Sequence, residues 1–110
     1  MKETLRHDLV INKGENYTVD FSYQEDDGTP VDVSGWTAEA QIREFPEAKD
    51  YQGFVCSADN TGFHLSLSAE NTERLSFSRG FYDVFITDPY GLSRVKLVQG
   101  RVSVIRDTTR

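Results

Sequence analysis

Cysteine is scarce in this chain, and so are the residues that most catalytic and metal sites require. A single cysteine, Cys56, excludes an intrachain disulfide and is typical of a small domain that folds in a reducing compartment. The two histidines, His7 and His64, lie on different predicted strands, so a structural zinc site would require most of these ligands at one point. No spacing of Ser, His and Asp, or of Cys and His, indicates an activated nucleophile. We therefore expect no enzyme, no cofactor and no metal.

Positive charge and long hydrophobic runs are also lacking. The net charge of −6 argues against a nucleic-acid surface and against an anionic membrane partner. No segment is apolar enough to be a signal peptide or a membrane span, which predicts synthesis in the cytoplasm. The first 55 residues hold 5 basic and 12 acidic residues and the last 55 hold 7 and 6. This asymmetry either favours head-to-tail contacts between copies or marks a solvated acidic face.

Helical periodicity is rare, and short alternating runs dominate instead. The clearest run is Tyr17–Tyr23, another is Trp36–Ile42, and turn signals recur about every ten residues. The one helical candidate is Ala69–Arg74, with Ser68 as its N-cap. The sequence predicts an all-β fold, an immunoglobulin-like antiparallel β-sandwich of seven to eight strands with one short helix. A single domain would span residues 1–110.

The turns predict which strands are neighbours. Segment 5–11 and segment 17–23 are expected to form a hairpin-like pair, and segments 54–56 and 63–67 a second hairpin across Asp59–Gly62. A short edge piece is expected at Val31–Val33, and Gly100 is a candidate for a bend in a long last strand.

Several apolar positions are predicted to form the core between the two sheets. Phe21, Trp36 and Val84 are the candidate central group, since no disulfide is available. Tyr82 is either the tyrosine of an immunoglobulin-type corner or an ordinary strand tyrosine. The full predicted core is Phe21, Trp36, Ile42, Leu65, Tyr82 and Val84.

Four residues are candidates for contacts with other molecules. Tyr51 and Tyr90 lie in predicted loops and could supply a sugar-stacking platform if they shared a face. Leu5 and Arg110 lie near the chain ends, beside outer strands whose unpaired backbone invites strand addition by a partner. The acidic turn Glu25–Gly28 has oxygen ligands but not the ordered spacing of a calcium loop, so turn chemistry explains it better.

The order of several sequence runs resembles small immunoglobulin-like virion accessory proteins of tailed bacteriophages. It is similar in particular to the N-terminal domain of phage baseplate upper proteins. The runs are Leu9–Phe21, Asp27–Ala38, Gln41–Arg43, Gly80–Val84, Thr87–Gly91 and Leu97–Val102.

The resemblance implies a virion structural protein made in the host cytoplasm. It would be an adaptor of the tail, baseplate or fibre, present in multiple copies and bound to other virion proteins, with no nucleic acid or membrane partner. Baseplate upper proteins continue into further segments, so the attachment point stays open. The alternatives are a capsid decoration protein or a carbohydrate-binding adhesion module.

Overall fold

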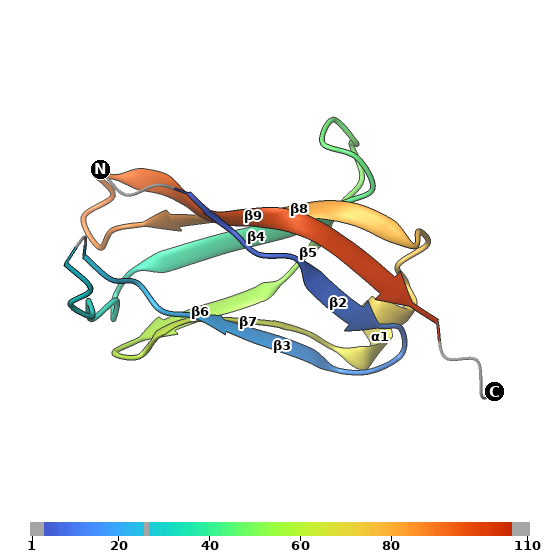
Figure 1. Ribbon diagram of the computed structural model, residues 1–110, viewed down its shortest axis with the longest axis horizontal. Coiled ribbons are helices and arrows are strands. Elements are labelled where there is room, and N and C mark those ends of the chain that lie inside the picture. Colours follow the sequence, from blue (N-terminus) through green and yellow to red (C-terminus); the bar gives the residue numbers. More distant parts are fainter. Residues whose placement is uncertain (1–3, 26, 107–110) are drawn as a thin grey trace.

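The computed structural model describes residues 4–25 and 27–106, which form a β-sandwich with one helix (Figure 1). The helix α1 covers Ala69–Glu73. Nine strands occur in the described residues: β1 (Leu5–Arg6), β2 (Leu9–Asn12), β3 (Tyr17–Phe21), β4 (Thr37–Arg43), β5 (Gln52–Gly53), β6 (Val55–Asp59), β7 (Gly62–Leu67), β8 (Arg79–Thr87) and β9 (Arg94–Ile105).

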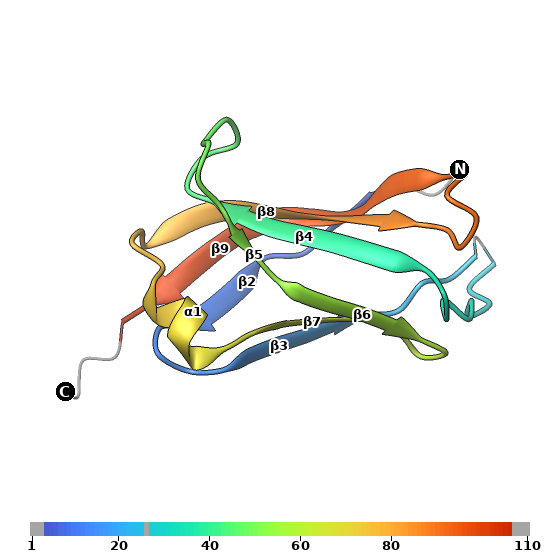
Figure 2. The same ribbon diagram turned by 180° about the vertical axis from the view of Figure 1, so that it is seen from behind.

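The strands form two facing sheets. The larger sheet has the order β1-β9-β8-β4-β5, with β2 also pairing with β9, and the smaller sheet has the order β3-β7-β6. The two layers are visible from both sides of the molecule (Figures 1 and 2). The predicted sandwich with one short helix is confirmed. The described strands number nine where seven to eight were predicted, and the two shortest, β1 and β5, are only two residues long.

The predicted hairpin between residues 5–11 and 17–23 is wrong. β2 runs parallel to β9, with Leu9 opposite Val102, while β3 lies in the other sheet, antiparallel to β7. The turn after Asn12 therefore carries the chain between layers, and turn residues alone do not distinguish such an arch from a hairpin. The hairpin of β6 and β7 is confirmed, with Asp59 opposite Gly62.

Apolar side chains from both sheets fill the space between the layers. Of the predicted core residues, Ile42, Leu65, Tyr82 and Val84 are buried, whereas Phe21 and Trp36 are half-buried. The Trp36 ring packs edge-on against Phe63, which is fully buried and which the sequence prediction omitted, and Phe21 packs against His7. The other buried apolar residues are Leu9, Ile11, Val33, Ala40, Leu67, Leu75, Ile86, Leu97, Val98 and Val102.

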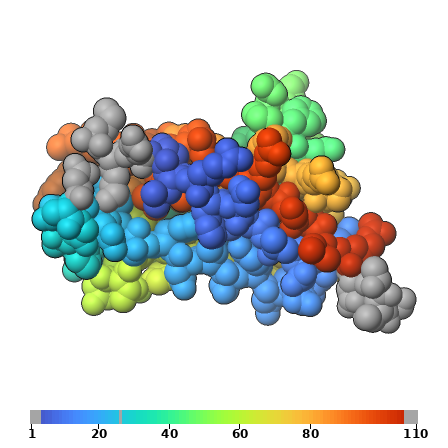
Figure 3. All heavy atoms as spheres, viewed as in Figure 1, coloured from blue at the N-terminus to red at the C-terminus, as the bar shows by residue number. Residues whose placement is uncertain are grey.

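Residues 4–12, here called the N-terminal strap, run along β9 and contain β1 and β2 (Figure 3). Between these two strands the strap passes against Gly100, where a Cβ atom would lie 2.1 Å from the His7 carbonyl oxygen. The His7 amide donates to the Gln99 carbonyl at 3.0 Å. The predicted long last strand is confirmed, since β9 continues through Gly100, and the glycine leaves room for the strap.

Tyr82, the register partner of Gly100 in β8, also holds the strap. Its hydroxyl donates to the His7 carbonyl, 75 residues away in the sequence, so the interpretation as a tyrosine corner, with a partner a few residues upstream, is wrong. Burial raises the pKa of the Tyr82 phenol, which keeps the hydroxyl a donor. The Arg101 amide adds a hydrogen bond to the Asp8 carboxylate at 2.9 Å.

Helix α1 closes one end of the sandwich. The predicted N-cap is confirmed, since the Ser68 hydroxyl accepts from the Asn71 amide at 3.2 Å. Thr72 is fully buried, and its hydroxyl accepts from the Gly14 amide and donates to the Glu15 carbonyl, which joins the helix to the turn between β2 and β3. Within the described residues, no helix is long and apolar enough to cross a membrane.

The predicted edge piece at Val31–Val33 is not a strand. Val33 is fully buried, and the one ladder contact nearby is an isolated bridge between Gln24 and Pro30. The segment is a loop that packs against the end of the sandwich. It is apolar because Val33 is buried in the core, not because the segment forms a strand.

Candidate interaction site

The outer face of the larger sheet gathers basic side chains from several strands. Antiparallel pairing places Phe81 between Arg43 and Arg101, Phe85 beside Lys96, and Thr87 beside Arg94. We call this surface the cationic face and define it by the outward residues of these rows and the adjoining strap: Arg6, Glu39, Gln41, Arg43, Arg79, Phe81, Asp83, Phe85, Thr87, Arg94, Lys96, Gln99 and Arg101.

A β-bulge brings these charges onto one side of the sheet. Val84 lies opposite Val98 but Phe85 lies opposite Lys96, so Leu97 is an extra residue in β9. The alternation of side chains therefore shifts at Leu97, which is buried together with Val98. Without the bulge, Lys96 and Arg101 would point to opposite faces, because side chains of a strand alternate with a period of two.

The charge of the cationic face is opposite to that of the whole chain. It carries six of the twelve basic residues but two of the eighteen acidic ones, a net charge of +4. The other described residues include four basic and thirteen acidic ones, a net charge of −9. The molecule is thus strongly polarised, and the face is a local positive region on an acidic domain.

Aromatic rings lie beneath the charged groups of this face. The Arg94 guanidinium lies 4.1 Å from the centre of the Phe85 ring, and the Lys96 ammonium lies 5.5 Å from the same ring. The Arg101 guanidinium lies 6.0 Å from the Phe81 ring. Such cation–π contacts orient the cationic groups. The Lys96 ammonium also donates to the Gln99 side chain at 3.2 Å, while the Arg94 guanidinium lies 3.9 Å from the Glu39 carboxylate.

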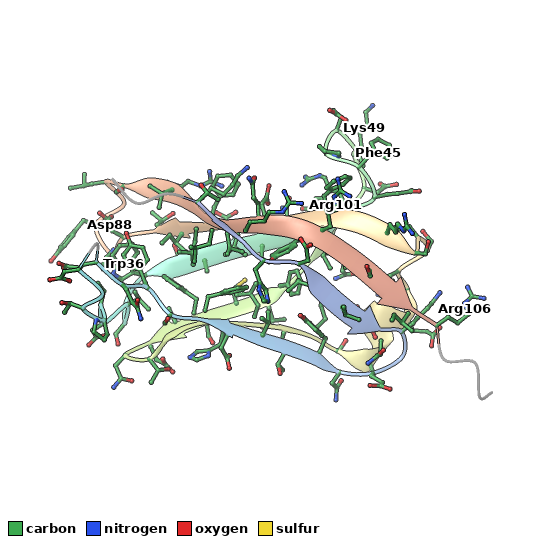
Figure 4. The ribbon with its side chains drawn as sticks, viewed as in Figure 1. Trp36, Phe45, Lys49, Asp88, Arg101 and Arg106 are labelled. Carbon is green, nitrogen blue, oxygen red and sulfur yellow. The ribbon has the colours of Figure 1, made fainter. Side chains whose placement is uncertain are left out.

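A shallow cavity of about 310 Å³ lies at one end of the cationic face, where the loop between β4 and β5 rises above the sheet. Figure 4 shows Arg101 on β9 below the part of this loop that carries Phe45 and Lys49. Arg43 anchors the loop, since its Nε donates to the Ala48 carbonyl at 3.0 Å. The cavity lining combines four cations with polar and aromatic groups: Arg6, Gln41, Arg43, Pro46, Phe81, Tyr82, Asp83, Lys96, Gln99, Gly100 and Arg101.

The predicted interaction residues are spread over the molecule. Tyr51 and Tyr90 are 55% and 82% exposed, but their loops lie at opposite ends of the sandwich, so they form no common platform (Figure 1). Tyr51 instead stacks on the Arg43 guanidinium at 4.9 Å. Leu5 is 46% exposed in β1, at the edge of the larger sheet, and Arg110 lies outside the described residues.

The outer face of the smaller sheet carries one ionic cluster. His64 Nδ1 lies 2.7 Å from the Asp20 carboxylate and His64 Nε2 lies 3.0 Å from the Asp59 carboxylate. Hydrogen bonds to these two carboxylates raise the pKa of His64, which favours the doubly protonated ring. The Thr61 hydroxyl, then His64, lower the pKa of Asp59. The His64 ring thus links β3, which carries Asp20, to the β6–β7 hairpin, which carries Asp59.

Within residues 4–25 and 27–106, no group of three or more His, Cys, Asp or Glu residues is arranged to hold a metal ion. Burial raises the pKa of the half-buried Cys56 thiol, which donates a hydrogen bond to the Phe54 carbonyl at 3.7 Å. Such a thiol packs as a small apolar side chain.

Solved structures resemble the chain in fold. No protein-family model and no curated protein sequence matches it. A solved chain from a photo-crosslinking study of multimeric cell-adhesive interactions of VGSC beta subunits matches with a TM-score of 0.52 and 10% identity, covering 91% of this chain and 92% of that one. The novel immune-type receptor 11 extracellular fragment from Ictalurus punctatus matches with a TM-score of 0.44 and 14% identity, covering 100% and 90%.

The two-layer architecture and the first of these matches define an immunoglobulin-like β-sandwich domain. At 10% identity the likeness shows the fold alone.

Proposed function

We propose that this immunoglobulin-like domain is a non-enzymatic module that docks on other proteins through its cationic face. The observation that carries the proposal is that half of all basic residues lie on one aromatic-bearing sheet face of an acidic domain. Arginine and aromatic residues are the types enriched in protein–protein interfaces, and a broad, shallow surface suits a protein partner better than a small substrate.

We further propose that the chain is a bacteriophage virion structural protein, an adaptor of the tail, baseplate or fibre. The support is the order of its sequence runs, which resembles immunoglobulin-like phage proteins over nearly the whole chain, together with the fold. Its partners would be other virion proteins, and it would be present in multiple copies, made in the host cytoplasm. A capsid decoration protein would use the same face and differs in its position in the particle.

A carbohydrate-binding module is less well supported. It requires coplanar exposed aromatic rings, but Tyr51 and Tyr90 lie at opposite ends of the sandwich, and the Phe81 and Phe85 rings lie under charged groups.

Particle incorporation tests the docking proposal. The double variant Lys96→Glu/Arg101→Glu reverses two charges of the cationic face, and Lys13→Glu/Arg106→Glu makes the same change in net charge near the far end of β9. We expect the first variant to fail to join phage particles and the second to join at the wild-type level. Equal incorporation of both variants would refute docking through this face.

Electron microscopy of intact particles tests the virion assignment and gives the position of the domain. Deleting Met1–Thr4 and Thr108–Arg110 tests whether the termini contribute contacts as the sequence suggested. Most of these residues lie outside the described part of the chain. Density for the domain on a tail, baseplate or fibre is expected, and particles that lack the chain would overturn the assignment.

A further inference from the structure

We infer that the cationic face binds an acidic polypeptide segment that lies extended over β8 and β9. This inference rests on the proposed docking function and specifies the chemistry of the partner. It follows from the spacing of the basic rows on the face, from the row of Asp83 between them, and from the charge of the rest of the domain.

The rows of the face have the spacing of an extended chain. Outward residues of β8 recur every second position, which corresponds to about 6.8 Å in an antiparallel strand. An extended partner segment has the same repeat for side chains on one of its sides. Such a segment therefore places one side chain on each successive row when it runs alongside β8.

The charges of the rows predict the partner's pattern. The adjacent rows of Thr87 and Phe85 offer Arg94 and Lys96 against one carboxylate, that of Glu39, which lies 3.9 Å from the Arg94 guanidinium. The row of Phe81 offers Arg43 and Arg101. Cations outnumber carboxylates in these rows taken together, so the rows favour carboxylates on a partner, since charge-assisted hydrogen bonds are the stronger ones.

The row between Phe85 and Phe81 differs from the other three. It holds Asp83 with Gln41 and Gln99 on either side, so it repels a carboxylate and accepts an amide or an ammonium group. The predicted segment is therefore acidic at three alternate positions and polar or basic at the fourth, as in Glu-x-Glu-x-Lys-x-Glu or the reverse order.

The surroundings of the face favour a short segment over a long polyanion. The net charge of −9 on the other described residues repels nucleic acid and anionic membranes beyond the immediate surface, while at physiological salt the attraction of the face extends over only about 8 Å. The loop between β4 and β5 bounds the cavity and carries Glu44, Glu47 and Asp50 against one Lys49. A segment of a few residues avoids both repulsions by staying over β8 and β9.

Fluorescence anisotropy with labelled peptides tests the inference on the whole chain. The probe is a seven-residue peptide of the pattern Glu-x-Glu-x-Lys-x-Glu with serine at each x, and the comparison peptide has its lysine exchanged with a terminal glutamate. A single-stranded oligonucleotide of similar charge is the second comparison. We expect the patterned peptide to bind more tightly than both, and its affinity to fall with added salt.

Two charge-reversal variants separate a specific site from general attraction. Lys96→Glu/Arg101→Glu should weaken peptide binding by about tenfold or more, and Lys13→Glu/Arg106→Glu should leave it within about twofold. Urea unfolding of both variants establishes that they are folded. Equal weakening in both variants, tighter binding of the oligonucleotide, or no binding of any peptide would overturn the acidic-segment inference.

The peptide and particle experiments fail independently. If the peptide does not bind but Lys96→Glu/Arg101→Glu still fails to join particles, the docking face stands and the partner chemistry is wrong. If the peptide binds and that variant joins particles normally, the acidic-segment site is real and the proposed docking role of this face is wrong.

Discussion

Replacing Gly100 by alanine should loosen the N-terminal strap. The added Cβ would lie 2.1 Å from the His7 carbonyl oxygen and 2.8 Å from its carbon, whereas an ordinary contact is 3.4–4 Å. These are backbone atoms, so the strap itself must move by about 1 Å or more. That displacement breaks the hydrogen bonds from the Tyr82 hydroxyl to His7, from the His7 amide to Gln99, and from the Arg101 amide to Asp8.

The expected loss follows from those three bonds. At about 0.5–1.5 kcal/mol each they contribute about 1.5–4.5 kcal/mol. Alanine in a strand recovers about 0.5–1 kcal/mol relative to glycine, so the net destabilisation should be about 0.5–4 kcal/mol. Urea unfolding measures it. Gly53→Ala is the matched control, because the nearest atom to its Cβ is 3.9 Å away, and it should leave stability unchanged or slightly higher.

A double-mutant cycle identifies the cause of the loss. Tyr82→Phe should cost about 1–2 kcal/mol in the wild-type chain but much less in Gly100→Ala, where its hydrogen bond is already broken. Equal costs in both backgrounds, or equal stability of Gly100→Ala and Gly53→Ala, would refute the account of the strap.

Three further substitutions test other parts of the fold. Because the pKa of His64 is raised in the folded chain, the stabilisation from its contacts with Asp20 and Asp59 is complete below about pH 6.5 and is lost as pH rises through the folded pKa. The free energy of unfolding in urea should therefore fall over this pH range, and His64→Gln should abolish the fall. Trp36→Ala should cost about 2–4 kcal/mol, because the half-buried ring packs against Phe63 and Tyr23; an unchanged midpoint would place the ring at the surface. Thr72→Val should cost about 1–3 kcal/mol by leaving the Gly14 amide and Glu15 carbonyl unpaired, whereas Thr72→Ser should retain most stability in the same assay.

Local signals in the sequence predicted local structure well. The alternation in Trp36–Ile42 corresponds to β4, the cap at Ser68 begins α1, and the turn Asp59–Gly62 joins β6 to β7. Each of these features depends on residues within a few positions of one another. Pairings across the chain left no such signal, and so the sequence did not indicate that the first strands lie beside the last one.

The cationic face was missed for a specific reason. Plain alternation along β9 assigns Lys96 and Arg101 to opposite faces, and nothing in the side chain of the extra residue Leu97 distinguishes it from an ordinary strand residue. The face also requires the register of β4 and β8, which no single strand reveals. Exposure of Tyr51 and Tyr90, by contrast, follows from their loop positions, but the distance between them does not.

The parallel pairing of β2 with β9 has a mechanical consequence. Because these strands run in the same direction, the two ends of the described chain lie at opposite ends of a body 46 Å long (Figure 1). Tension applied between Leu5 and Ile105 would act along the strands and load their cross-strand hydrogen bonds in shear, all at once, instead of opening them one by one. Single-molecule pulling through these two positions should therefore need a higher force than pulling through the paired residues Arg79 and Ser103, which would open the β8–β9 ladder from one end, and a domain built this way can transmit load along its length without unravelling from its edge.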